Sequence, residues 1–285
     1  MLSFVSRRQK WIAINNVTVC YKFYADFLTL IDKSIKTMFA FPSRKIPVAF
    51  LLIATLVITQ CKTARVSGGT GSKSIRTLIV GGGSSHDFNR WYKQDDAETL
   101  ARDGFATVTY ISNPDSMKYF LPATDVLYIC FNQSINNPQS RQAIMDFVAA
   151  GKGLVIGHAA LWYNWKDWPE YNTQIVSGGT HGHDRYGSFE VNIVNPSHPV
   201  TNGISKNFTL KDELYRYEPD PKGPGIEVLA TANVAGSDKI STSVFVVKNN
   251  KARIVGIALG HDAASHDLPE YQALLRNTVR WVAKR

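Results

Sequence analysis

Short apolar runs alternate with amphipathic segments from about Arg76 onward. The runs that predict buried β-strands span residues 76–83, 106–112, 126–132 and 153–159. The amphipathic segments that predict helices span 90–104 and 138–151. Gly104 is placed to end the first helix, and Pro138 lies early in the second. Buried strands that alternate with helices predict a mostly parallel sheet covered on both faces.

The pattern changes in the second half of the chain. Residues 161–187 contain three tryptophans and two histidines without a clear period, which predicts a long functional loop around a short helix. The strands expected after this loop span 188–194, 226–232, 243–248 and 252–259, and a final helix spans 268–284. The Asn249–Lys251 segment between two of these strands is typical of a hairpin, so the later sheet should include antiparallel strands.

An export signal is predicted near the N-terminus. Arg44 and Lys45 precede fourteen uncharged, mostly apolar residues, 46–59, a run shorter than the ~20 residues of a spanning helix. Cys61 follows this run as it does in the lipobox of bacterial lipoproteins, where the thiol is lipidated, although Gln60 departs from the usual small residue. The sequence therefore favours a lipoprotein held at the membrane by a lipid anchor; a plainly cleaved signal and an uncleaved anchor remain open.

This interpretation divides the chain into four parts. Residues 1–37 form an upstream extension, with Met38 as the expected start of translation. The signal spans 38–61, a glycine-rich tether spans 62–75, and the folded domain spans 76–285. The expected location is the periplasm, either free or anchored to the membrane. Cys130 lies inside a predicted strand and is interpreted as a buried core residue, not a nucleophile.

The charge of the chain argues against nucleic acid as a partner. The formal net charge is +9, from 32 basic and 23 acidic residues, but residues 1–61 hold eight of the basic and only two of the acidic ones. The rest of the chain carries only +3, without a run of Lys and Arg. No electrostatic footprint for nucleic acid is present.

Histidines follow several of the predicted strands. His86 follows the first strand, His158 ends the "VIGHA" run, and His261 and His266 follow the strand over 252–259. Ligands of open α/β sheets bind at the carboxyl ends of the strands, so these histidines predict one shared site. His158 stands where a sharp strand-to-helix turn would hold a nucleophile. The alternative is that each histidine only caps a turn.

Other residues suggest metal or sugar binding. The turn "GGGSSHD" resembles phosphate-binding loops but lacks their spacing and lysine, so a tight turn beside the site is favoured. In "HGHD", His181 and His183 would share one face if extended and could bind a divalent metal such as Zn²⁺ with a carboxylate. Of the adjacent Asp212 and Glu213, at most one is expected to face the site. The aromatic rings of 162–171 suit either a core or a sugar-binding cleft.

Together these motifs resemble one known family. The segments "LIVGGGSSHDF", "GKGLVIGHAALW", "WPEYNTQIVSGGTHGH", "HPVTNGI", "LKDELY" and "GIALGHD" occur in the order and rough spacing of ThuA-like proteins, the trehalose-utilisation family. The resemblance implies a flavodoxin-like, three-layer α/β sandwich related to class I glutamine amidotransferases. It also implies a role in carbohydrate metabolism, linked to keto-sugars and keto-glycosides, and some members are suggested to bind a metal.

The resemblance and the residues lead to one expected function. The turn after the strand over 153–159 carries an imidazole where amidotransferases carry a cysteine, so glutamine hydrolysis is not expected. We expect acid/base chemistry on a small oxidised sugar or glycoside, with His158 and His261 transferring protons and Asp262 or Glu213 orienting them. The residues expected to bind substrate are His86, Asp87, Trp162, Glu170, His183 and Tyr215. The alternatives are a sugar-binding lipoprotein without catalysis and a metal-dependent hydrolase.

Overall fold

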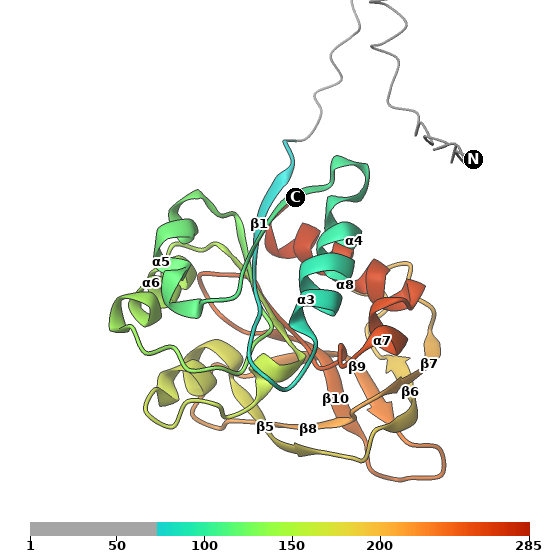
Figure 1. Ribbon diagram of the computed structural model, residues 1–285. Coiled ribbons are helices and arrows are strands. Elements are labelled where there is room, and N and C mark those ends of the chain that lie inside the picture. Colours follow the sequence, from blue (N-terminus) through green and yellow to red (C-terminus); the bar gives the residue numbers. More distant parts are fainter. Residues whose placement is uncertain (1–72) are drawn as a thin grey trace, which may run out of the picture. The chain divides into compact units, whose positions relative to one another are not determined.

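The computed structural model describes residues 73–285, which form one mixed α/β unit (Figure 1). Its main sheet has nine strands in the order β2-β1-β3-β4-β11-β10-β9-β6-β7. The first five strands in this order are parallel to one another. They are β2 (Ala106–Ile111), β1 (Ile75–Val80), β3 (Val126–Ile129), β4 (Gly153–Gly157) and β11 (Ile254–Ile257).

The remaining four strands continue the sheet in antiparallel pairs. They are β10 (Ser241–Val247), β9 (Ile226–Asn233), β6 (Gly187–Ile193) and β7 (Asn207–Asp212). Because four successive antiparallel steps separate β7 from β11, β7 runs in the same direction as the parallel strands. Its last residue therefore reaches the edge at which the parallel strands also end.

Helices cover both faces of the parallel half of the sheet. In Figure 1, α5 (Met117–Phe120) and α6 (Pro138–Ala149) lie on one side of β1, and α3 (Phe88–Arg90), α4 (Ala97–Ala101) and α8 (Pro269–Val282) lie on the other. A helical turn of wider spacing, Trp91–Asp96, joins α3 to α4, and the short α7 (Ala263–His266) precedes α8.

The helices are anchored by apolar stripes that their sequence already contains. In α8 the buried positions follow the three-to-four-residue spacing of one helix face; they are Tyr271, Leu274, Leu275, Thr278, Val279 and Val282. Helix α6 begins after Asn137, whose side chain accepts from the N–H groups of Gln139 and Ser140. It ends before Gly151, which takes a left-handed φ of +74°.

The expected fold class is confirmed, and most of the differences concern its second half. The strands and helices predicted in the first half lie within a few residues of their observed bounds, but α5 was not predicted. The segment predicted as a long loop contains a helical turn, Tyr171–Val176, and a strand, β5 (Gly178–His183), which pairs with β8 (Tyr215–Pro219) in a separate small sheet. The sequence of β5, "GGTHGH", holds no large apolar residue, so only its partner strand reveals it.

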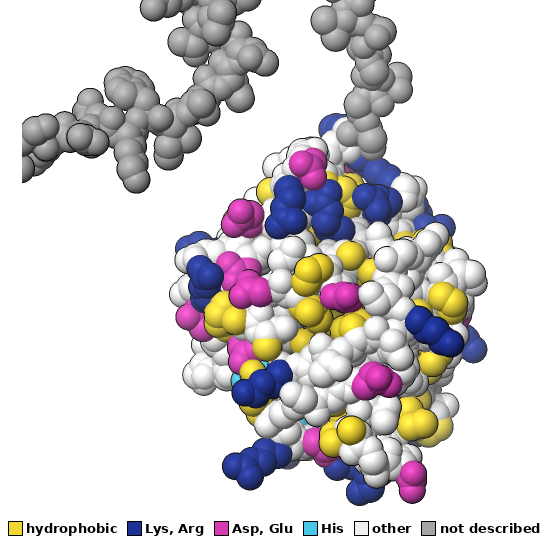
Figure 2. Space-filling model, turned by 90° about the vertical axis from the view of Figure 1, so that its right-hand side faces the viewer, with side chains coloured by type: hydrophobic (Ala, Val, Ile, Leu, Met, Phe, Trp, Pro, Cys, Tyr) yellow, Lys and Arg dark blue, Asp and Glu magenta, His cyan; other side chains and the backbone are white. Residues whose placement is uncertain are grey.

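Two further features complete the description. On the face shown in Figure 2, positive and negative side chains are interspersed among uncharged surface. Within residues 73–285, no helix is both long and apolar enough to cross a bilayer. The predicted upstream extension, the export signal with Cys61, and nearly all of the tether lie outside the described residues.

Candidate functional site

Four residues from four separate strand ends meet at the carboxyl edge of the sheet. His86 follows β1, His158 follows β4, His261 follows β11 and Glu213 follows β7. One nitrogen or oxygen from each side chain lies within 4.8 Å of the corresponding atoms of the other three. We call these four residues the histidine–glutamate cluster. Its position is the one at which open α/β sheets bind ligands.

His158 stands on a sharp turn directly after β4. Its backbone has a φ of 37°, a left-handed conformation that costs energy for a residue with a side chain. Its side chain is fully buried, and Nδ1 lies 2.7 Å from the carbonyl oxygen of Ala258. Because a carbonyl only accepts, Nδ1 carries the proton, and a neutral ring then has its lone pair on Nε2. Nε2 is buried and has no hydrogen-bond partner.

His86 and His261 lie next to the ring of His158 and face each other. His86 Nε2 lies 3.1 Å from His261 Nδ1, and His86 Nδ1 pairs with the Ser85 hydroxyl at 2.8 Å. The ring centroids of His86 and His158 are 4.8 Å apart. Burial, followed by the nearby His158 and His261, lowers the pKa of His86 to about 3. His86 is therefore neutral at physiological pH.

Glu213 joins the cluster to a neighbouring cavity. Its Oε2 lies 3.2 Å from His261 Nδ1 and 3.6 Å from His158 Nε2, and its Oε1 lies 3.6 Å from His183 Nε2. Burial alone would raise the pKa of Glu213, but the neighbouring His158, His261 and His183 prevail and lower it to about 2. Glu213 is therefore a carboxylate that shares its two oxygens between the cluster and His183.

Asp212 fixes the position of Glu213 through a hydrogen bond to its backbone. This carboxylate is fully buried and accepts hydrogen bonds from the backbone N–H of Gly260 at 2.8 Å and from the Ser265 hydroxyl. Its other oxygen accepts from the N–H of Glu213 at 2.6 Å. Asp212 thereby ties the end of β7 to the turn that carries His261. The expectation that only one of the two adjacent carboxylates faces the site agrees with this arrangement.

A cavity of about 230 Å³ opens beside the cluster. Its lining combines polar groups with an aromatic wall, and consists of Ser85, His86, Asn132, Ala159, Trp162, Asn164, His183, Glu213 and Tyr215. Tyr215 stacks on His158 with a centroid distance of 4.2 Å, and Trp162 meets Tyr215 edge-on at 5.8 Å. Aromatic rings beside directed polar groups are suited to a small polar ligand with apolar faces, such as a sugar.

A second cavity of about 360 Å³ shares His86 with the first. It is lined in part by Gly82, Gly83, Ser112 and Gln133. Gly82 and Gly83 have φ values of +126° and +116°, which only glycine adopts readily. The glycine run found in the sequence therefore builds a tight turn beside the site, as favoured above.

The structure separates the two histidines that were expected to bind a metal together. His183 reaches Glu213, whereas the exposed His181 stacks on Tyr163 at 4.3 Å and belongs to no cluster. The pairing of β5 with β8 is irregular between Thr180 and His183, so the simple alternation of a regular strand does not hold there. The four potential ligand atoms that lie within 4.8 Å of one another belong instead to the histidine–glutamate cluster.

Three other expected site residues serve local structure. Asp262 caps α7 through the N–H of Ala264 and accepts from the Tyr186 hydroxyl at 2.6 Å, so Glu213 and not Asp262 contacts the ring of His261. Asp87 is exposed, caps α3 and lines the second cavity but not the first. Glu170 is exposed, precedes the Tyr171–Val176 turn and does not line the cavity.

Sequence reasoning missed the buried ion pair of His266 and Asp96. His266 Nδ1 lies 2.7 Å from Asp96, and its Nε2 lies 3.1 Å from the carbonyl of Gly260. Both ring nitrogens face acceptors, so the ring is a doubly protonated cation. Burial alone would lower the pKa of His266, but Asp96 and the Gly260 carbonyl prevail and raise it. The pair supports the Gly260 turn that carries His261.

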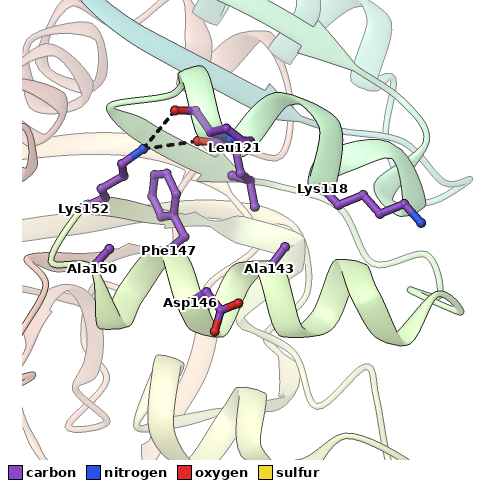
Figure 3. A pocket seen from close by; sticks show the side chains of 8 residues that line it. Lys118, Leu121, Ala143, Asp146, Phe147, Ala150 and Lys152 are labelled. Carbon is purple, nitrogen blue, oxygen red and sulfur yellow. Dashed lines mark hydrogen bonds between the residues drawn. The ribbon is translucent and has the colours of Figure 1, made fainter.

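Another cavity, of about 270 Å³, lies between α5 and α6 (Figure 3). The ammonium group of Lys152 donates to the carbonyls of Leu121 and Thr124, at 3.3 and 2.8 Å. The lining of this cavity contains no histidine and shares no residue with the histidine–glutamate cluster. The chemistry of the described residues therefore concentrates at the carboxyl edge of the sheet.

The fold and the site define an α/β protein with a histidine-rich ligand site at the carboxyl edge of its parallel strands. The family model described as "ThuA: Trehalose utilisation" matches residues 76–282. The chain therefore belongs to the ThuA family, and the resemblance noted in the sequence is confirmed.

Solved structures support the same fold. A ThuA-like protein from Parabacteroides merdae is 24% identical, with a TM-score of 0.65 over 74% of this chain and 90% of that one. A ThuA-like protein from Bacteroides uniformis is 20% identical, with a TM-score of 0.59 over 73% and 91%. A cytoplasmic protein from Salmonella typhimurium is 16% identical, with a TM-score of 0.52 over 73% and 99%. Among curated proteins, no relative matches the chain.

Proposed function

We propose that this protein is an enzyme that moves protons on an oxidised sugar or glycoside bound in the cavity beside the histidine–glutamate cluster. The observation that carries the proposal is the His183–Glu213 pair, which opens into a cavity walled by Trp162 and Tyr215. Membership of the trehalose-utilisation family supports a carbohydrate substrate. The adjoining cavity at His86 offers space for a second group, which favours a glycoside over a free monosaccharide.

The burial of His158 decides which groups face the ligand. His158 is fully buried, and neither His158 nor His261 lines the cavity. These two histidines, expected from the sequence to transfer protons, would therefore not contact the ligand directly. His183 does line it, and its Nδ1 lies 2.8 Å from the carbonyl of Asp184, so Nδ1 carries the proton. Nε2 of the neutral ring is then free to accept a proton, and Glu213 Oε1 stabilises the resulting cation.

The reaction follows from the chemistry of a ketone. A carbonyl at C3 of a sugar acidifies the C2–H bond, so His183 Nε2 takes the C2 proton and the electron pair enters an enolate. The electrons then form the C1–C2 double bond as the C1–O bond breaks, and His183 returns its proton to the departing oxygen. Return of the proton to C3, with loss of the C2 hydroxyl proton, instead gives the 2-keto isomer.

Turnover of oxidised and ordinary disaccharides by the full-length chain tests this function. We expect loss of 3-keto-trehalose and release of its non-oxidised half, measured by NMR, with no change in trehalose itself. His183→Gln should lower turnover about 100-fold, the usual contribution of a positioned acid/base group. His198→Gln, whose ring packs on Trp281, is the matched control and should keep wild-type turnover.

Other outcomes support other functions. Saturable binding of the sugars without conversion would contradict the enzyme and support a binding module. Wild-type turnover by His183→Gln would remove His183 from the reaction.

We further propose that the protein is exported and anchored through a lipid on Cys61, because Cys61 follows a basic and then apolar stretch. Labelling of the expressed chain with radioactive palmitate should mark the wild type and not Cys61→Ser. Equal labelling of both, or recovery of both in the soluble cytoplasmic fraction, would contradict the anchor.

A further inference from the structure

The histidine–glutamate cluster contains a buried nitrogen lone pair that no hydrogen-bond donor satisfies. His158 Nε2 is fully buried and has no hydrogen-bond partner, and a carboxylate oxygen of Glu213 lies 3.6 Å from it. When His86 Nε2 and Glu213 Oε2 both present lone pairs, a single N–H on His261 Nδ1 has to serve both, at 3.1 and 3.2 Å. A buried acceptor without a donor is costly, so an arrangement that leaves one in place calls for a group that satisfies it.

The outer hydrogen bonds orient the rings as they are oriented in metal sites. His158 Nδ1 donates to the carbonyl of Ala258, and His86 Nδ1 pairs with the Ser85 hydroxyl. Histidines that bind metals almost always use their second nitrogen in this way, which fixes the tautomer and directs the other lone pair at the ion. Asp212 in turn fixes the backbone on both sides of the cluster, at Glu213 and at Gly260.

Three of the six distances within the cluster are close to the edge lengths of a coordination tetrahedron. Ligand atoms bound at 2.0–2.2 Å in a tetrahedron are about 3.3–3.6 Å apart. The pairs within the cluster measure 3.1, 3.2 and 3.6 Å, and all four atoms lie within 4.8 Å of one another. Three imidazoles and one carboxylate suit zinc and similar first-row ions, whereas calcium and magnesium prefer oxygen ligands.

We propose that His86 Nε2, His158 Nε2, His261 Nδ1 and Glu213 Oε2 bind one divalent first-row transition-metal ion. The site differs from the His181–His183 pair considered from the sequence, because His181 points to Tyr163. Glu213 Oε1 remains directed at His183, so metal binding leaves the proton-moving pair of the proposed function intact. The ion lies at the cavity wall formed by His86 and Glu213, where a sugar carbonyl that binds as a fifth ligand would be polarised.

Metal binding is measured without any substrate. The full-length chain is treated with a chelator, dialysed and titrated with Zn²⁺ by calorimetry, and Co²⁺ is added separately to record its visible absorbance. We expect one Zn²⁺ per chain, a cobalt spectrum typical of four-coordinate nitrogen and oxygen ligation, and no binding of Mg²⁺ or Ca²⁺. X-ray absorption at the zinc edge of the wild type should show imidazole ligands.

Matched variants locate the ion. His261→Gln and Glu213→Gln should each raise the Kd for Zn²⁺ at least about 100-fold, and Ser85→Ala about tenfold, as expected for a supporting group. His181→Gln, the same change on the exposed ring of β5, should leave the Kd unchanged. Circular dichroism shows whether each variant folds, and the wild-type absorption spectrum tests the site even if a cluster variant does not fold.

The results separate this inference from the proposed function. Absence of stoichiometric Zn²⁺ and Co²⁺ binding by the wild type, or an equal loss of binding in His181→Gln, overturns the metal site. Keto-sugar turnover that a chelator leaves unchanged also overturns the catalytic part of the inference while the proposed function stands. Stoichiometric binding without turnover of any oxidised sugar supports the metal site and overturns the proposed function.

Discussion

The buried carboxylate of Asp212 accepts a hydrogen bond from the backbone N–H of Gly260, at 2.8 Å, and so joins the ends of β7 and β11. This contact holds Glu213, at the end of the antiparallel half of the sheet, beside the histidines that follow the parallel strands. The geometry of the candidate site therefore depends on a buried residue that does not line the cavity.

Asp212→Asn should impair both stability and the site. The amide keeps one acceptor oxygen but turns an NH₂ group toward an N–H or hydroxyl donor, which leaves buried polar groups unpaired. We expect the free energy of unfolding to fall by about 2 kcal/mol, measured with urea. Asp87→Asn is the control, because Asn caps the start of α3 equally well. Equal stability of the two variants would contradict the role of Asp212.

The turn at His158 requires a glycine before it. A Cβ on Gly157 would lie 2.6 Å from the ring of Tyr128, which is buried and bonded to Asp96. Gly157→Ala should therefore destabilise the protein by about 1–3 kcal/mol in thermal unfolding. Gly182→Ala, on β5, places its Cβ in open space and should change stability by less than about 1 kcal/mol. A neutral Gly157→Ala would show that Tyr128 can move.

The His266–Asp96 pair predicts a specific dependence of stability on pH. The pKa of His266 is raised in the folded protein, so the stability that the pair contributes is fully present below the unfolded pKa of about 6.5. This contribution is lost as the pH rises through the folded pKa. Urea unfolding between pH 5 and 9 should show the loss in the wild type and a flatter profile in Asp96→Asn. A wild-type contribution that grows with pH would contradict the prediction.

The aromatic wall predicts an effect on binding more than on chemistry. Trp162 lines the cavity and contacts the rings of Tyr215 and His183. Trp162→Ala should raise the KM for an oxidised disaccharide about tenfold, because it removes one sugar-facing ring. Trp162→Phe keeps an aromatic face and should stay within about threefold of the wild type. Unchanged KM in both variants would place the sugar elsewhere.

The sequence was sufficient to predict the histidine part of the cluster. His86, His158 and His261 each follow an apolar run, and parallel strands end at a common edge, so their convergence followed from the fold class alone. The role of Glu213 was harder to predict. Its arrival depends on the direction of β7, a partly exposed strand whose sequence, "NFTLKD", carries a weak apolar signal.

Other features depend on contacts that no local pattern records. His181 and His183 differ in role because the pairing of β5 with β8 is irregular between them. The burial of Asp96 beside His266 joins residues from opposite ends of the domain, and in the sequence Asp96 is one of several charged residues of an amphipathic helix. Tertiary packing alone distinguishes it from its neighbours.

The left-handed backbone at residue 158 is a conformation that favours glycine over the histidine found there. Glycine at that position would relax the main chain and leave an imidazole-shaped hole under Tyr215, since glycine adopts positive φ without penalty. Free imidazole in the buffer would then refill the hole and restore the missing nitrogen. The turn after β4 would then hold an exchangeable imidazole, while the strand before it stays unchanged.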